Sequence, residues 1–116
     1  MSEANRVGGL GEETAAQYLL TRGYEVRERN YRTKYGEIDI IAQENDTIVF
    51  IEVKTRTGSF ALPREFVTLA KQKKLRKTAE IYLSQTCLHE HFCRFDVIEV
   101  QPDRTGYSVS HIIDAF

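Results

Sequence analysis

Three charged residues interrupt two apolar stretches of this chain and could do chemistry together. Asp39 lies among isoleucines, and Glu52 and Lys54 follow the apolar run at residues 48–51. Charged groups inside apolar strands are costly to bury unless a partner offsets their charge. A divalent cation with a reacting water would be such a partner. The three residues therefore predict a metal-dependent phosphodiesterase site.

The spacing of these residues makes a prediction about strand register. Side chains alternate faces along a strand, so Glu52 and Lys54 share one face of the strand predicted over residues 47–55. If residues 45 and 46 are the centre of a turn, an antiparallel register pairs residue 43 with residue 48. Asp39 then lies directly opposite Glu52. A shift of one residue would place Asp39 opposite Ile51 and separate the two carboxylates.

Two neighbouring carboxylates repel unless one takes a proton or a cation lies between them. Mg²⁺ favours one or two carboxylates together with water and phosphate oxygens, which is what this pair offers. Lys54 could position the water, deprotonate it or hold a phosphate oxygen, and the sequence leaves these roles open. The alternative is a solvated strand face at Glu52 and Lys54, with Asp39 as an ordinary residue at a strand end.

Charge is distributed unevenly along the chain. Residues 54–77 carry eight basic side chains and one acidic side chain, giving +7, while residues 1–53 and 78–116 each sum to −4. A basic segment of this kind is typical of a phosphate-binding surface, although a solvated helix face is an equal alternative. The predicted nucleic-acid contacts are Arg56, Arg64, Lys71, Lys73, Lys74, Arg76 and Lys77.

The pattern of apolar residues and turn signals predicts a mixed α/β domain with an antiparallel meander and a helix on each side. Gly23 ends the first helix and Thr68 is a favourable N-cap for the second. The element order is αβββαββ. The predicted elements are helices over residues 7–22 and 69–84, strands over 24–31, 36–43, 47–55, 92–100 and 107–113, a loop over 56–67 and a turn over 102–106.

Length and composition bound the class of protein. A chain of 116 residues with 41% hydrophobic and 28% charged residues predicts one globular domain over residues 1–116. No apolar run is long enough for a membrane span, and residues 1–9 lack a signal-peptide core, so we expect a cytoplasmic protein with no membrane partner. A two-fold homodimer would suit a symmetric substrate, but the sequence does not require one.

Other chemistry-bearing residues support weaker interpretations. Cys87 and Cys93 flank two histidines, but in an extended strand the two cysteines would lie roughly 20 Å apart, too far for one zinc ion. Arg94 and Asp96 are expected to form a structural ion pair or to brace the site. Three aromatic residues near the basic segment could stack on unpaired bases or pack in the core: Tyr31, Tyr35 and Phe60.

The whole pattern resembles the YraN family of small resolvase-like proteins, within the PD-(D/E)XK nuclease superfamily. An aspartate after an apolar residue, followed by Glu-Val-Lys at the end of the next strand, is the central motif. The proline that precedes the aspartate in the superfamily motif is absent, as it is in many members, and Ile38 occupies its place. The residues that carry the resemblance are Gly11, Glu12, Ala15, Ala16, Tyr18, Leu19, Gly23, Tyr24, Arg29, Asn30, residues 36–42, residues 49–56, Lys71, Leu75 and residues 94–97.

The resemblance implies a restriction-endonuclease-like α/β fold with an αβββαβ core and a mixed sheet flanked by helices. It implies metal ligation by Asp39, Glu52, the Val53 main-chain carbonyl and Glu12, with Lys54 as the catalytic lysine and Mg²⁺ or Mn²⁺ as the ion. Glu12, and not Glu13, matches the extra helical glutamate of related resolvases. The implied activity is endonucleolytic cleavage of DNA, with branched DNA as a candidate substrate. The alternative is a nucleic-acid-binding module on the same fold that does not cleave.

Overall fold

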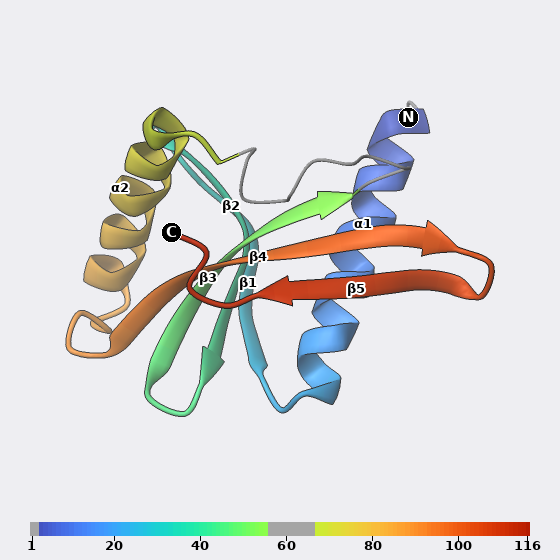
Figure 1. Cartoon of the computed structure of the whole chain (residues 1–116). Helices are drawn as coiled ribbons and strands as arrows, with labels where there is room; N and C mark the ends of the chain where they lie inside the picture. The colour runs from blue at the N-terminus through green and yellow to red at the C-terminus, as the bar shows by residue number, and fades with distance from the viewer. Residues whose placement is uncertain (1–2, 56–66) are drawn as a thin grey trace.

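The computed structural model describes residues 3–55 and 67–116, and side chains from residue 10 onward. Within these residues two helices and five strands follow the predicted order αβββαββ (Figure 1). Among the described residues no helix has the length and apolar character that crossing a membrane requires. The elements are α1 (Glu3–Thr21), β1 (Glu25–Thr33), β2 (Gly36–Glu44), β3 (Thr47–Thr55), α2 (Leu69–Gln85), β4 (Phe92–Asp103) and β5 (Gly106–Ile112).

The five strands form one mixed sheet in the order β1-β2-β3-β4-β5. The antiparallel meander covers β1 to β3, and β4 then pairs with β3 in parallel before β5 returns antiparallel to β4. Parallel neighbours need a long crossover, which here contains α2. The fold is therefore α/β, with an αβββαβ core and a mixed sheet flanked by helices, as the sequence predicted.

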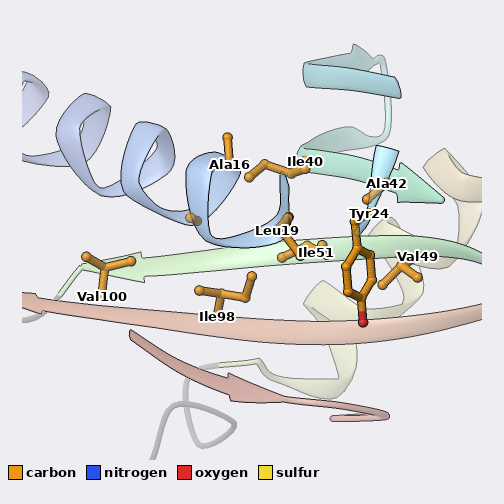
Figure 2. Close-up of a cluster of buried hydrophobic side chains, with 10 residues drawn as sticks. Ala16, Leu19, Tyr24, Ile40, Ala42, Val49, Ile51, Ile98 and Val100 are labelled. Carbon is orange, nitrogen blue, oxygen red and sulfur yellow. The ribbon is translucent and has the colours of Figure 1, made fainter. Parts of the chain in front are cut away.

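Helix α1 packs on one face of the sheet through the small and apolar residues Ala15, Ala16 and Leu19 (Figure 2). Their recurrence at three- and four-residue spacing gives one apolar stripe. The stripe covers buried side chains from the three central strands, and Tyr24 closes the cluster just after the helix. The strand members are Ile40, Ala42, Val49, Ile51, Ile98 and Val100.

Helix α2 covers the opposite face. Thr68 caps it as predicted, since its side chain accepts a hydrogen bond from the Lys71 backbone N–H at 3.2 Å. The buried residues of the helix meet the alternate side chains of the same strands, which is the two-sided burial expected of central strands. This second cluster is Ile38, Ile41, Ile48, Phe50, Val67, Leu75, Ala79, Tyr82, Phe95 and Val97.

The predicted boundaries hold closely except at the start of α1, which begins at Glu3 and not at residue 7, and near the last hairpin. The predicted turn over residues 102–106 is too wide, because β4 continues to Asp103 and only Arg104 and Thr105 form the turn. Pro102 remains in the strand opposite Tyr107, one residue before β4 ends. Of the loop predicted over residues 56–67, only Val67 belongs to the described residues, and it is buried.

Candidate active site

The β2–β3 hairpin has the register that the sequence predicted. Gln43 pairs with Ile48, and the pairing of the two strands continues to Ile40 with Ile51. Asp39 and Glu52 occupy the next position along the two strands. There the Val53 backbone N–H donates to Asp39 Oδ2 at 2.7 Å. Asp39 is thus held by the backbone of β3, immediately beside the residues of the Glu-Val-Lys motif.

Asp39 lies in an environment that disfavours its ionised form. Burial and then the negative charge of Glu52 raise the pKa of Asp39 to about 7, and Glu12 and Glu37 add to the effect. The hydrogen bond from Val53 acts in the opposite direction but does not offset burial. An acidic group with its pKa near neutrality is typical of a site that exchanges a proton or accepts a cation.

Glu52 lies between two lysines. Its Oε1 is 2.6 Å from Lys71 Nζ of α2 and 3.3 Å from Lys54 Nζ of β3. Glu52 itself is almost fully buried. The predicted juxtaposition of Glu52 and Lys54 therefore occurs on the α2 face of the sheet. Lys71, which the sequence predicted as a nucleic-acid contact, also reaches the carboxylate of the central motif.

The pKa values of the two lysines beside Glu52 are shifted in opposite directions. Burial lowers the pKa of Lys54, and Lys71 adds to the lowering, while Glu52 acts against it. For Lys71, burial alone would lower the pKa, but the hydrogen bond and charge of Glu52 outweigh it and raise the pKa. Lys71 therefore stays charged and balances Glu52, whereas Lys54 becomes the amine more ready to lose its proton.

Glu12 reaches this region because α1 approaches β3 closely. A Cβ at Gly11 would overlap Thr55 Oγ1, so any larger residue would require Thr55 or the helix to move. With its amide nitrogen facing the two carboxylates, Asn30 donates to Glu12 Oε2 and to Glu37 Oε1, both at 3.1 Å. Glu13 instead pairs with Arg29 at 2.7 Å. Asn30 therefore links the predicted helical glutamate to the start of β2.

Asn30 and Glu37 are residues of this region that the sequence interpretation did not assign to it. Asn30 has φ +54°, in the left-handed region that asparagine tolerates better than most residues. An asparagine in the middle of a polar strand is a weak signal of such a kink. Nothing in the spacing of Glu37 distinguishes it from a solvated strand residue.

The side chains around Asp39 and Glu52 offer a divalent cation only part of its coordination shell. Among the side chains of residues 10–55 and 67–116, no three histidine, cysteine, aspartate or glutamate residues gather closely enough to hold a metal unaided. Mg²⁺ does not require such a cage, since it is commonly held by one or two carboxylates and completes its shell with water and phosphate oxygens. Burial, and then the negative charge of Glu52, raise the pKa of Asp39, and a cation beside this carboxylate would favour its ionised form. The residues present therefore fit an ion that is completed by substrate.

The remaining predicted nucleic-acid contacts are dispersed over α2. Lys73, Lys74 and Lys77 are exposed, and Arg76 lies over the rings of Phe95 and Phe116 at 4.8 and 5.7 Å. Arg56, Arg64 and Phe60 lie outside the described residues. A pocket of about 350 Å³ opens between the start of β2 and the first turns of α2, with Glu37, Lys71 and Lys74 in its wall.

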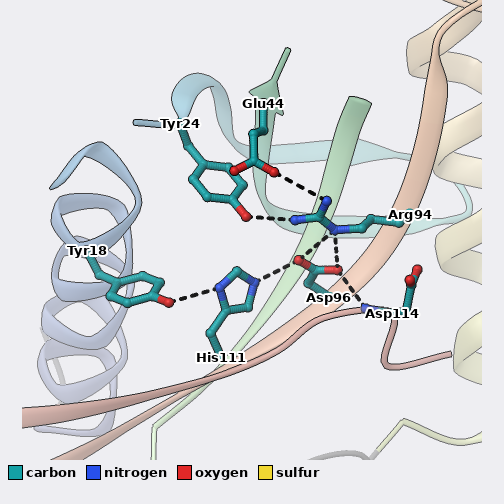
Figure 3. A network of polar contacts seen from close by, with 7 residues as sticks. All are labelled: Tyr18, Tyr24, Glu44, Arg94, Asp96, His111 and Asp114. Atoms are coloured by element: carbon teal, nitrogen blue, oxygen red, sulfur yellow. Dashed lines mark hydrogen bonds and ion pairs between the residues drawn. The ribbon is translucent and has the colours of Figure 1, made fainter. Parts of the chain in front are cut away.

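A second polar network lies on the α1 face of the sheet (Figure 3). Asp96, fully buried, contacts Arg94 Nε at 3.1 Å and His111 Nε2 at 2.7 Å, and His111 Nδ1 lies 3.1 Å from the Tyr18 hydroxyl. Arg94 also donates to the Tyr24 hydroxyl at 2.7 Å. These partners enclose the carboxylate, so the predicted structural role of Arg94 and Asp96 fits better than a catalytic one. Cys87 and Cys93 are exposed free thiols.

Comparison with known proteins places these features in one family. Residues 11–100 match the model described as "Uncharacterised protein family UPF0102". A UPF0102 protein of Caldanaerobacter subterraneus subsp. tengcongensis is 45% identical over 122 residues, covering all of both chains. UPF0102 proteins of Alkaliphilus oremlandii and of Clostridium botulinum strain Loch Maree are 46% and 48% identical, with at least 95% of this chain and 93% of each relative covered.

Proposed function

Because this chain belongs to the uncharacterised protein family UPF0102, the YraN family that the sequence predicted, we propose a function from the geometry of its own site. The protein is a Mg²⁺- or Mn²⁺-dependent endonuclease that hydrolyses phosphodiester bonds in DNA. Branched DNA is the candidate substrate that the resemblance to resolvases favours.

The observation that carries this proposal is the meeting of Asp39 with the Glu-Val-Lys end of β3. The Val53 N–H binds Asp39 at 2.7 Å, and Lys54 Nζ lies 3.3 Å from Glu52 Oε1. A surface strand has no need to bury a carboxylate whose pKa rises to about 7. A site that binds a cation and a phosphate does need such a carboxylate. The carboxylate holds the cation beside the phosphate, where negative charge develops during hydrolysis.

The residues have distinct roles in the proposed hydrolysis. Asp39 and Glu52, with the Val53 carbonyl and Glu12, would hold the cation. The bound ion supplies Lewis acidity and lowers the pKa of water. Lys54, whose pKa is lowered, accepts a proton from the attacking water as its oxygen bonds to phosphorus. The bond from phosphorus to the leaving oxygen breaks, and that oxygen takes a proton from solvent. Lys71 keeps Glu52 oriented.

A second candidate is a DNA-binding module that does not cleave. The observation in its favour is that Glu52 Oε1 already has two ammonium partners, Lys71 and Lys54. If these contacts persist with DNA bound, Glu52 cannot ligate a cation through that oxygen. Cleavage in the presence of metal distinguishes the two functions.

The deciding experiment compares cleavage of four-way-junction, duplex and single-stranded DNA with Mg²⁺, with Mn²⁺ and with EDTA. We expect Lys54→Ala to lower the cleavage rate by about 10²- to 10⁴-fold, the usual contribution of a general base. Glu52→Ala and Asp39→Asn should also weaken the dependence on metal concentration. Arg104→Ala, an exposed change in the turn between β4 and β5, is the matched control and should retain cleavage.

Cleavage that persists in Glu52→Ala and Lys54→Ala would assign the activity to other residues or to a contaminant. Metal-stimulated DNA binding without any cleavage by the wild-type protein would favour the binding module instead. Circular dichroism of each variant separates loss of the site from loss of the fold.

A further inference from the structure

We propose that the DNA substrate has an unpaired nucleotide beside the cleaved phosphodiester, with its base stacked on Tyr35 and its backbone phosphates along Lys71, Lys74 and Lys77. This inference rests on the proposed endonuclease function and specifies the substrate structure. The geometry that carries it is a row of three lysines leading from the central carboxylates to one exposed aromatic ring.

The lysine row follows one side of α2. Residues spaced by three lie close together on a helix surface, and six residues span about 9 Å along the axis. Lys71 begins the row at Glu52, 2.6 Å away. Lys74 lines the pocket and lies against the start of β2, since a Cβ at Gly36 would be 3.6 Å from Lys74 Cβ. Lys77 ends the row, 5.6 Å from the centre of the Tyr35 ring.

Tyr35 is presented by the short turn between β1 and β2. Its backbone N–H donates to Thr33 Oγ1 at 3.1 Å, which holds the turn, while its side chain is 38% exposed. Lys34 lies 5.3 Å from the ring centre, so two cations flank this one aromatic side chain. Among the aromatic residues singled out in the sequence, Tyr31 is instead occupied, edge-on to Tyr82 and hydrogen-bonded to Gln85.

The chemistry of the row matches single-stranded nucleic acid. Such strands are bound by basic grooves that follow the backbone and by aromatic rings on which bases stack. A lysine over an exposed ring contributes only about 2- to 5-fold to an equilibrium constant, whereas a stacked base contributes about 5- to 150-fold. A base can therefore displace one lysine from Tyr35, and the released ammonium can pair with phosphate.

The acidic side chain in the pocket wall does not oppose this assignment. Glu37 Oε2 lies 3.3 Å from Arg32 Nε, and Glu37 Oε1 accepts from Asn30 at 3.1 Å. Its charge is therefore directed toward β1 partners. A paired duplex, in contrast, covers both faces of each internal base and offers nothing for Tyr35 to stack on.

The test measures binding in EDTA, where the proposed cleavage cannot occur. Fluorescence anisotropy would follow wild-type protein binding a fluorescein-labelled oligothymidylate and a blunt duplex of the same length. We expect Tyr35→Ala to weaken binding of the oligothymidylate by about 5- to 150-fold and to leave duplex binding unchanged. For the single strand, the slope of log affinity against log salt concentration is negative, and Lys74→Ala should make it shallower by about 0.7.

Two variants serve as matched controls. Tyr35→Phe keeps the ring and should bind the oligothymidylate about as tightly as the wild-type protein. Tyr107, which is 36% exposed at the start of β5, is similar in exposure but lies on the hairpin away from α2 (Figure 1), so Tyr107→Ala should have no effect.

The proposal is overturned if Tyr35→Ala binds the oligothymidylate as the wild-type protein does, if it weakens duplex binding equally, or if the wild-type protein does not bind the single strand. Each outcome is separate from the cleavage experiment. Loss of cleavage in Lys54→Ala with no effect of Tyr35→Ala would support the proposed function and reject only the stacking site.

Discussion

Asp39 acquires its raised pKa from its position where the β2–β3 pairing ends. The pairing of β2 with β3 stops at Ile40 with Ile51. Beyond it, the Asp39 side chain accepts a hydrogen bond from the Val53 backbone N–H. Burial and the charge of Glu52 outweigh that hydrogen bond and raise the pKa to about 7. In the unfolded chain the same carboxyl titrates near its ordinary value of 3.8. The folded state therefore binds a proton that the unfolded state releases.

This difference predicts a pH-dependent cost of stability in the metal-free protein. The contribution of Asp39 to the free energy of unfolding is fully present below pH 3.8 and is lost as the pH rises through about 7. At higher pH the folded protein must hold the Asp39 carboxylate as a buried negative charge. Relative to Asp39→Asn, the wild-type protein should lose on the order of 2 kcal/mol of unfolding free energy between pH 5 and pH 8. Urea denaturation in EDTA at both pH values measures this.

Adding Mg²⁺ at pH 8 should restore most of that difference in the wild-type protein and none of it in Asp39→Asn. Asp46→Asn, at the exposed hairpin turn, is the control. It keeps Asp39, so it should lose the same unfolding free energy between pH 5 and pH 8 as the wild-type protein. A wild-type protein whose stability relative to Asp39→Asn does not change with pH would contradict the assignment of the raised pKa.

How much of the site the sequence could predict depends on the distance along the chain between its parts. Asp39 and Glu52 were predicted to adjoin because a short turn fixes the register of the hairpin, and the register is confirmed. Lys71 was assigned only to DNA contact, because its approach to Glu52 depends on the docking of α2. Asn30 was missed because its role depends on a left-handed backbone conformation in β1.

At the scale of elements, one glycine determines how closely α1 approaches the end of β3. Gly11 is buried in the helix, and a Cβ there would overlap Thr55 Oγ1. The sequence predicted the helix and its apolar stripe, but it could not indicate that Gly11 faces a strand terminus. This close approach brings the adjacent Glu12 toward Asn30 and the central carboxylates.

Replacement of this glycine should cost stability despite the better helix propensity of alanine. Alanine at Gly11 gains about 1 kcal/mol in propensity, but overpacking costs about 1 to 3 kcal/mol and the helix must move. We expect Gly11→Ala to lower the free energy of unfolding by about 1 kcal/mol, measured by urea denaturation. Adding Thr55→Ala removes the hydroxyl and should recover most of the loss.

Gly36→Ala is the matched control, because its nearest atoms would be at an ordinary 3.6 Å. It should change stability by much less than Gly11→Ala. If the two glycine variants are equally destabilised, or if Thr55→Ala gives no recovery, then the close approach of α1 to β3 is not the cause.

Across the whole molecule, the buried network around Asp96 joins α1, β4 and β5 (Figure 3). Burial alone would raise the pKa of Asp96, but hydrogen bonds from His111, Arg94 and the Asp114 backbone N–H outweigh it and lower the pKa. The stability from this group is therefore present above the pKa of the unfolded chain and is lost as the pH falls through the lower folded value.

Removing the charge of Asp96 should destabilise the protein strongly, because Arg94 would keep a partly buried charge with only the more distant Glu44, at 3.6 Å, as a carboxylate partner. We expect Asp96→Asn to lower the free energy of unfolding by about 3 kcal/mol, in the range for a broken buried ion pair. Thermal and urea denaturation at pH 7 measure this. Asp103→Asn, exposed at the end of β4, should have little effect, and equal stability of the two variants would contradict the role of the network.

The same network also has a consequence for the order in which the molecule assembles. Asp39 meets Val53 across 14 positions of the chain, whereas Tyr18 and His111 are separated by 93 positions. Local contacts close with little loss of chain entropy, so the hairpin of the site can form early and the network late. Asp96→Asn should then unfold faster while its refolding rate stays near that of the wild-type protein, which stopped-flow measurements across urea concentrations can resolve. The hairpin that carries the chemistry would thus form first, and a contact on the opposite face of the sheet would determine how long it lasts.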